Sequence, residues 1–207
     1  MQNKIGVLGG TFNPVHIGHM IMAQDALEEF GLSQVLFVPA AQPPHKPSTA
    51  TLAPARHRTA MLEIALEHDL RFELCDIELG RPGLSYSVDT IKALRQQCSG
   101  AGLVFIIGSD SLLELHAWKD ITDLLALCEF GVIPRPGFPL DLESLRRTGL
   151  PEPWPDRLLG RVARGHHVAV SSSDIRHRVA EGLSIRYLVH SRVDMYITEH
   201  ALYRGRL

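Results

Sequence analysis

The sequence predicts an α/β protein whose parallel sheet is covered by helices on both faces. Short apolar runs alternate with segments of helical periodicity along most of the 207 residues, which is the pattern of repeated strand–helix units. The runs at 35–38 and 103–107 are apolar without alternation, as strands buried on both sides are. Glycine or serine clusters stand where several runs end and helices begin. Together these observations predict a Rossmann-like, doubly wound parallel sheet with a C-terminal helical cap.

The length and composition indicate one globular domain. A chain of 207 residues with 45% hydrophobic side chains fits a single unit spanning residues 1–207, whose helical C-terminal part begins near residue 171. The 21 basic and 23 acidic residues nearly balance, for a formal net charge of −2. We therefore expect neither nucleic acid nor a membrane as a partner, and any anion site must be local.

Cysteine spacing and the start of the chain bear on its compartment. Cys75, Cys98 and Cys128 lie far apart and form no C-x-x-C pair. An odd number of cysteines at such spacing argues against a disulfide framework or a zinc knuckle. No signal-peptide pattern opens the chain, and no apolar stretch approaches the length of a membrane span. These features predict a cytoplasmic protein.

The first strand is expected at residues 5–8, and the most informative segment of the chain follows it. Residues 9–19 read G-G-T-F-N-P-V-H-I-G-H, and a helical pattern comes next. Gly9 and Gly10 permit a close approach to a ligand that a Cβ would block, and Gly18 would do so within the first helical turn. A helix N-terminus presents unpaired N–H groups and a partial positive charge, which suit a phosphate.

Two histidines in this segment are candidates for chemistry. His16 and His19 are three residues apart, so at helical spacing they share a face. Their N–H groups could stabilise phosphate oxygens that gain charge in a transition state. Histidines at this spacing also occur as a surface pair or as two metal ligands. The segment contains neither G-x-G-x-x-G nor a Walker lysine, so it matches neither of those phosphate-binding fingerprints.

The second strand, at 35–38, leads into a proline-rich loop. Residues 40–47 contain three prolines and Lys46. The loop would hold this lysine at the carboxyl end of a strand, where open α/β sheets bind ligands; the alternative is an ordinary surface loop. A helix is expected at 56–68 and a third, less regular strand at 72–77.

The next helix, at about 85–98, begins with serines that would cap it. Thr90 lies one turn in, where its hydroxyl could face a ligand or bond its own helix. The strand at 103–107 then ends at Gly108, a second strand–glycine–helix junction. There Asp110 could accept hydrogen bonds from ribose hydroxyls, cap the helix, or do both.

Two further side chains follow this junction. Trp118 has polar neighbours, so its ring could be partly exposed and stack on a base. The alternative is a position in the core. After a helix at 121–128 and a strand at 130–133, Arg135 stands between two prolines. A rigidly placed guanidinium suits a carboxylate or phosphate, although a solvated loop arginine is the commoner case. Residues 138–164 look mostly irregular, with one short helix near their start.

The last strand–helix junction lies near the C-terminus. A sixth strand is expected at 167–170, and the serines at 171–173 would add hydroxyls and helix N–H groups to another anion site. Arg176 falls in the first turn, where it opposes the helix dipole, and a bound polyphosphate would account for it. The alternative is a serine-capped helix with an exposed arginine. An amphipathic helix at 191–202 closes the chain.

These motifs resemble those of a known family. Residues 9–19 resemble the G-G-T-F-[DN]-P-x-H-x-G-H signature of the nucleotidyltransferase superfamily whose hallmark is an H/T-x-G-H motif. Nearly the whole chain is similar to the bacterial nicotinate-nucleotide adenylyltransferases. The likeness also rests on P-P-H-K near residue 45, S-Y-S-V-D-T near residue 87, I-I-G-S-D-S-L with Trp118, R-P-G at Arg135, V-S-S-S-D-I-R at 170–176 and the terminal Y-I-T-E-H-x-L-Y. Mild departures are Asn13, where aspartate is also frequent, Ser173 in place of threonine, and Lys119 in place of an aromatic residue.

The resemblance implies transfer of an adenylyl group from ATP to nicotinate mononucleotide, giving deamido-NAD and pyrophosphate in NAD biosynthesis. It implies that the catalytic residues are His16, His19, Lys46 and Arg176. The residues expected to bind ATP are Gly9, Gly10, Thr11, Phe12, Gly18, His19, Gly108, Asp110, Ser171, Ser172, Ser173 and Arg176. Those expected to bind the nicotinate nucleotide are Asn13, Lys46, Thr90, Trp118, Lys119 and Arg135. Mg²⁺ would arrive on ATP, without dedicated protein ligands, and a homo-oligomer is compatible with the sequence.

Two other functions are weighed against this one. Another nucleotidyltransferase, such as a pantetheine-phosphate adenylyltransferase or a cytidylyltransferase, would share the first motif and the serine-rich motif, but not the motifs near residues 45, 87 and 108. A non-catalytic nucleotide-binding sensor could use the same scaffold. The intact set His16, His19, Lys46 and Arg176 argues against a sensor.

Overall fold

A computed structural model describes residues 3–44, 52–138 and 140–205. At its centre, five strands pair in parallel in the order β3-β2-β1-β4-β5. Their carboxyl ends therefore share one edge of the sheet, as the sequence predicted. The strands are β1 (Lys4–Gly10), β2 (Gln34–Pro39), β3 (Phe72–Leu74), β4 (Gly102–Gly108) and β5 (Glu129–Ile133).

Helices cover both faces of the sheet, because alternate side chains of each strand enter two separate apolar clusters. Phe37 and Ile106 face one cluster, and Leu36 and Phe105 face the other. The first cluster is covered by α1 (Ile17–Glu29), α2 (Ala55–Leu66), α8 (Ser172–Ala180) and α9 (Ser191–Glu199). The second is covered by α3 (Ser87–Gln97), α4 (Ser109–Leu113), the 3₁₀ helix η1 (Leu115–Ala117), α5 (Ile121–Leu127), α6 (Leu142–Arg147) and α7 (Trp154–Leu159). This is the doubly wound α/β architecture that the sequence predicts.

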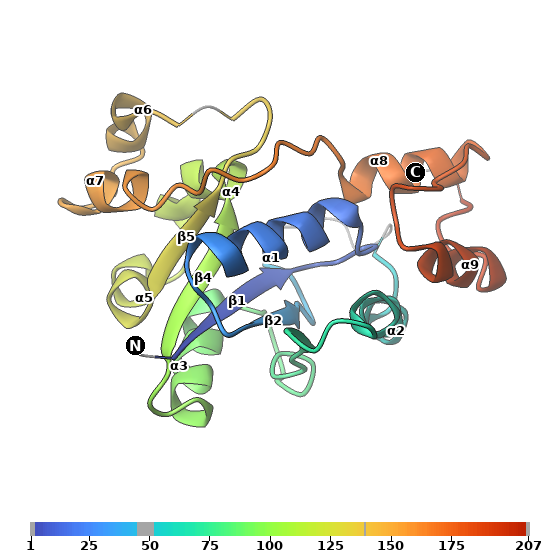
Figure 1. Ribbon diagram of the computed structural model, residues 1–207, viewed down its shortest axis with the longest axis horizontal. Coiled ribbons are helices and arrows are strands. Elements are labelled where there is room, and N and C mark those ends of the chain that lie inside the picture. The colour runs from blue at the N-terminus through green and yellow to red at the C-terminus, as the bar shows by residue number, and fades with distance from the viewer. Residues whose placement is uncertain (1–2, 45–51, 139, 206–207) are drawn as a thin grey trace.

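The C-terminal helices α8 and α9 lie at one end of the molecule, beyond α1 and α2 (Figure 1). Ile175 and Ile197 are buried in the same cluster as Phe37 of the sheet, so this part of the chain shares the central core. The backbone N–H of Ile17 donates to the carbonyl of Leu188 at 2.9 Å, which brings the C-terminal segment to the first residue of α1. Among the described residues, none of the helices combines the length and apolarity that crossing a membrane requires.

The prediction of a sixth strand at 167–170 is wrong. The chain makes an isolated bridge to Val132 of β5 at Val162, and residues 167–170, which come later, belong to no strand of the sheet. The carboxylate of Asp25, on α1, accepts the backbone N–H of His166 at 2.7 Å. Gly165 lies so close that a Cβ there would be 2.5 Å from the Asp25 carboxylate. Contact with α1 therefore replaces pairing with β5.

Helix α7 lies in the segment that the sequence suggested was mostly irregular. Pro153 is its N-cap and Pro155 falls in its first turn. Proline is tolerated there because the first N–H groups of a helix have no partner within the helix. The prolines that suggested an irregular segment thus begin a helix.

Candidate active site

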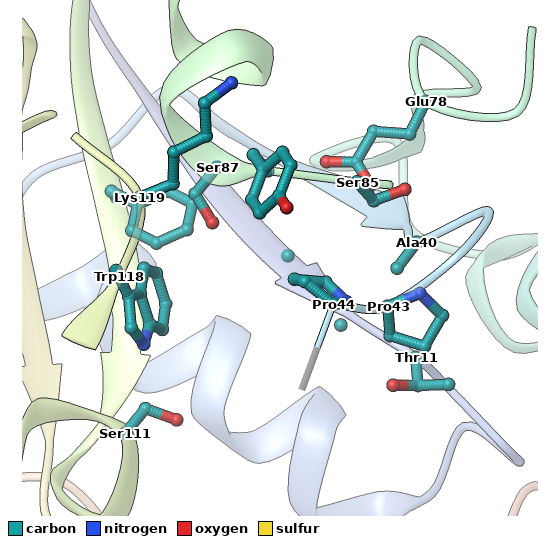
Figure 2. A pocket seen from close by; sticks show the side chains of 14 residues that line it. Thr11, Ala40, Pro43, Pro44, Glu78, Ser85, Ser87, Ser111, Trp118 and Lys119 are labelled. Atoms are coloured by element: carbon teal, nitrogen blue, oxygen red, sulfur yellow. The ribbon is translucent and has the colours of Figure 1, made fainter. Parts of the chain in front are cut away.

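The turn between β1 and α1 forms one wall of a cavity at the carboxyl edge of the sheet (Figure 2). Gly9, Gly10 and Thr11 line it, and Trp118 and Lys119, which follow η1, line its far side. The loop after β2 adds Pro43 and Pro44, which face Trp118 across the opening. The cavity has a volume of about 220 Å³. It joins three segments that the sequence assigned to ligand binding.

Trp118 gives this cavity a flat aromatic wall. Its indole ring meets the ring of Phe105 edge-on, with the centroids 6.0 Å apart and an interplanar angle of 82°. Beside it, the ammonium of Lys119 lies 3.1 Å from the carboxylate of Asp89 and 4.6 Å from the ring centroid of Tyr86. A fixed ring beside a cation suits a planar base that carries a negative group.

His16 and His19 line a second, narrower hollow together with Gly18 and Arg135. The backbone N–H of His16 donates to Nδ1 of His19 at 3.2 Å. An accepting nitrogen carries no proton, so neutral His19 is protonated on Nε2. The ring of Phe12, which is 1% exposed, packs edge-on against His19 with the centroids 5.0 Å apart. The buried ring of Phe12 thus packs against the catalytic candidate and helps to hold it in place.

His16 is held neutral by its surroundings. Its side chain is 5% exposed, and burial, with a smaller contribution from the charge of Arg135, lowers the pKa of the imidazole to about 3. Its buried Nδ1 has no hydrogen-bond partner among the described protein atoms. A Cβ on Gly18 would lie 3.0 Å from this nitrogen. A side chain at position 18 would therefore crowd the ring of His16.

Arg135 and Asp110 form an ion pair at the end of β4. One guanidinium nitrogen of Arg135 lies 3.0 Å from Oδ2 of Asp110. The backbone N–H of Arg135 donates to the hydroxyl of Ser109 at 2.9 Å. A Cβ on Gly108 would lie 2.3 Å from Oδ1 of Asp110, so the glycine makes room for the pair. The N-cap of α4 is Gly108, so Asp110 is not the cap. Its buried Oδ1 has no partner among the described atoms.

The serine-rich segment at 171–173 and Arg176 make hydrogen bonds to the β1–α1 turn. Ser171 caps α8 with its hydroxyl, and the hydroxyl of Ser172 donates to the carbonyl of Pro14 at 2.8 Å. Arg176 donates to the carbonyl of Asn13 at 2.9 Å and to the hydroxyl of Ser173 at 3.1 Å. Arg176 is half-buried and is a neighbour of the turn, although it does not line the hollow of the two histidines.

Asn13, expected at the nicotinate nucleotide, has a side chain that is engaged inside the protein. Its side chain is 3% exposed. Its Oδ1 accepts the backbone N–H of Ala53 at 3.0 Å and the hydroxyl of Tyr203 at 2.8 Å. The side chain therefore joins the β1–α1 turn to the start of α2 and to the C-terminal segment.

Thr90 is also engaged inside the protein. It is 2% exposed, and its hydroxyl donates to Oε1 of Glu78 at 2.5 Å and accepts from Arg81 at 3.0 Å. Glu78 lines the cavity, and Thr90 does not. Its hydroxyl also lies 3.3 Å from the carbonyl of Tyr86, which agrees with the alternative of a bond to its own helix. Lys46, the remaining residue expected here, lies outside the described residues.

Asp25 and His166 are site residues that the sequence reasoning missed. Asp25 is 6% exposed, and its Oδ1 lies 2.7 Å from Nδ1 of His166. This hydrogen bond raises the pKa of His166, which lines the same hollow as His16 and His19. No sequence signal pointed to the pair, because the two residues are 141 positions apart. Within the described ranges, no cluster of three or more histidine, cysteine or acidic side chains could hold a metal ion.

The fold and this arrangement of glycines, histidines and helix starts are those of a nucleotidyltransferase. The model of the cytidylyltransferase-like family matches residues 7–178. Relatives named "probable nicotinate-nucleotide adenylyltransferase" from Opitutus terrae and Thermomicrobium roseum are 44% and 42% identical, over 97% and 98% of this chain and 98% and 92% of theirs. The chain belongs to the nicotinate-nucleotide adenylyltransferase family.

A solved structure shows the same fold. It is the nicotinic acid mononucleotide adenylyltransferase of Plasmodium falciparum complexed with NaAD, with a TM-score of 0.78 and 19% identity over 99% of this chain and 98% of that one. At that identity the likeness concerns the fold.

Proposed function

We propose that this chain transfers the adenylyl group of ATP to nicotinate mononucleotide, giving deamido-NAD and pyrophosphate. The observation that carries the proposal is the place of the β1–α1 turn. Gly9, Gly10 and Thr11 border the cavity of Trp118, while His16 and His19 border the second hollow. One short segment thus lies between two sites that could each hold a nucleotide. Full-length relatives at 44% and 42% identity are named for this activity.

We assign the two nucleotides from the chemistry of the two hollows. The cavity beside Trp118 and Lys119 suits the nicotinate ring and its carboxylate. The hollow of His16 and His19 also contains apolar side chains, among them Met22 and Val170, which suit the base of ATP. Lys46 stays a proposed contact of the incoming phosphate.

The reaction needs no general base in this arrangement. The 5′-phosphate of nicotinate mononucleotide is already anionic, so its oxygen attacks the α-phosphorus of ATP while the bond to the pyrophosphate oxygen breaks. Catalysis then consists of alignment and stabilisation of charge. His19 would donate from Nε2, the neutral His16 would line the same site, and Arg176 with the amides of Ser172 and Ser173 would hold the β- and γ-phosphates.

Several features of the working enzyme are part of the same proposal. Mg²⁺ enters with ATP as part of the substrate, since it keeps most of its waters and few protein ligands. The chain works as one domain in the cytoplasm, with residues from about 171 onward as its helical part. All proposed contacts come from one chain, and a homo-oligomer is compatible with them.

Paired kinetics test the proposal. Pyrophosphate release is measured with ATP and, in turn, nicotinate mononucleotide, nicotinamide mononucleotide and pantetheine phosphate. We expect the acid to be preferred over the amide by about 10- to 150-fold, the equivalent of roughly 1.5–3 kcal/mol for one hydrogen bond to a charged group. Preference for pantetheine phosphate would assign the chain to a sister reaction. ATP binding without turnover of any acceptor would indicate a sensor.

A further inference from the structure

Arg58, on α2, is buried without a carboxylate among its described hydrogen-bond partners. Its side chain is 1% exposed. Its guanidinium donates from Nε to the carbonyl of Ala53 at 3.0 Å, from Nη1 to that of Thr11 at 2.8 Å and from Nη2 to that of Ala41 at 3.4 Å. All three acceptors are backbone carbonyls.

Such a group is costly to keep in a protein interior. Removing a charge from water is unfavourable unless hydrogen bonds or an opposite charge compensate. Burial accordingly lowers the pKa of Arg58, and the nearby phenol of Tyr203 partly opposes this shift. An apolar side chain of similar size would fill the same space without this cost. The role of the arginine is therefore to hold the three backbone segments that carry these carbonyls.

The three carbonyls belong to segments that shape the site. Thr11 lies in the β1–α1 turn and lines the cavity. Ala41 and Ala53 stand at the two ends of the segment that connects β2 to α2. Pro43, two residues after Ala41, lines the cavity opposite Trp118. The guanidinium of Arg58 thus joins the β1–α1 turn to both ends of the segment that connects β2 to α2.

The backbone around Ala41 and Ala53 is also held by other groups. The hydroxyl of Ser85 accepts the backbone N–H groups of Ala41 at 3.0 Å and Gln42 at 3.3 Å. Oδ1 of Asn13 accepts the N–H of Ala53 at 3.0 Å. The carbonyls of Ala41 and Ala53 therefore face Arg58 while neighbouring N–H groups face other anchors, which fixes the course of the backbone at both residues.

We propose that Arg58 is a positioning residue for the transfer reaction. It sets the distance between the turn at Thr11 and the cavity wall that begins at Ala41, so that the phosphate of one nucleotide meets the α-phosphate of the other in line. The inference rests on the proposed function, because it assigns one nucleotide to each side of the turn. Lysine cannot replace the arginine, since an ammonium lacks the planar fork that reaches three carbonyls in fixed directions.

The test compares variants of Arg58 with a matched control. Arg58→Lys and Arg58→Met are made beside Arg56→Met, which changes an exposed arginine of the same helix. We measure steady-state pyrophosphate release and, by calorimetry, the affinities of ATP and of deamido-NAD, the product that spans both nucleotide sites. Urea unfolding confirms that each variant is folded at the assay temperature.

Misalignment has a signature that loss of stability does not share. We expect both Arg58 variants to lose about 10- to 100-fold in kcat/KM and to bind deamido-NAD more weakly by a similar factor. The affinity for ATP alone changes little, and Arg56→Met behaves like the wild type. If the Arg58 variants fail to fold, Ser85→Ala, which releases the other side of the Ala41 peptide, should weaken deamido-NAD binding more than ATP binding.

Two results would overturn the inference. One is wild-type kcat/KM in folded Arg58→Lys, and the other is an equal loss of affinity for ATP and deamido-NAD. An equal loss in folded Ser85→Ala counts against it in the same way. A wild-type protein without transfer to nicotinate mononucleotide would instead refute the proposed function, so the two failures are distinguishable.

Discussion

The backbone N–H of His16 donates to Nδ1 of His19, and the two imidazole rings stack with their centroids 3.7 Å apart. The hydrogen bond fixes the proton of neutral His19 on Nε2. His16 is neutral because burial lowers its pKa, so it does not repel charge on the neighbouring ring. The relationship thus sets which nitrogen of neutral His19 is the donor before a nucleotide binds.

His19→Ala should lower turnover about 100-fold or more. The change removes the Nε2 donor, and loss of one transition-state donor typically has an effect of this size. Initial rates of pyrophosphate release at saturating ATP measure it. His68→Ala, which removes an exposed histidine in the turn after α2, should leave the rate unchanged. A His19→Ala rate near that of the wild type would refute the assignment.

His16 should stay neutral throughout the range from pH 8 to pH 5. Burial and the charge of Arg135 lower its pKa to about 3, whereas its unfolded-state pKa is near 6.5. The ¹⁵N shifts of its ring should therefore stay constant over this range, while those of His166, whose pKa Asp25 raises, report protonation. A His16 resonance that titrates near pH 6.5 would show that the imidazole is not desolvated.

The same depressed pKa predicts a loss of stability in acid. Below pH 6.5 the unfolded chain binds a proton at His16 and the folded chain does not, so the free energy of unfolding falls as the pH decreases toward 3. His16→Asn removes this contribution. Urea midpoints of the variant should consequently depend less steeply on pH between 6.5 and 4 than those of the wild type. Equal slopes would contradict the prediction.

His166 should affect stability in the opposite direction. Its pKa is raised in the folded state by the hydrogen bond to Asp25, so its contribution is complete below the unfolded pKa and disappears as the pH rises through the folded pKa. His166→Gln should therefore be less stable than the wild type at pH 5.5, and this difference should vanish at pH 9. His167→Gln, at the exposed neighbouring position, serves as the control. An equal deficit at both pH values would mean that the charge of His166 plays no part.

The strands of the sheet could be predicted from the sequence because their signal is local. Residues 103–107 are apolar on both sides, and the structure covers both faces of β4 with helices. The sixth strand failed because Asp25, far away in the sequence, binds the backbone of His166. No local pattern records such a contact.

The distinction between local patterns and contacts between distant residues also applies to the site. Gly9 and Gly10 could be placed at the carboxyl edge because the topology brings strand ends together, and Trp118, expected as a stacking ring, lines the same cavity. The surroundings of Asn13 could not be predicted, since its partner Tyr203 is 190 positions away. Arg58 looked like an ordinary helical residue, and only the folded chain brings three carbonyls to it.

Tyr203→Phe should destabilise the protein by about 1 kcal/mol. The change deletes the hydroxyl that donates to Oδ1 of Asn13 at 2.8 Å, while Ala53 still donates to the same oxygen. Urea unfolding at neutral pH measures the effect. Tyr187→Phe, at a side chain that is 83% exposed, should change the free energy of unfolding by less than about 0.5 kcal/mol. Equal stability of the two variants would show that the contact with Asn13 contributes nothing.

Trp118→Ala should raise the KM for nicotinate mononucleotide and leave that for ATP unchanged. Loss of stacking on a base corresponds to about 1–3 kcal/mol, hence to a rise of about 5- to 150-fold. The other tryptophan provides the control, because Trp154 lies on α7 and does not line the cavity. If the KM for ATP rises instead, the cavity of Trp118 holds the adenine and the two nucleotides exchange places. Because the segment from Gly9 to His19 borders both hollows, that exchange would leave the reacting phosphates beside the same turn.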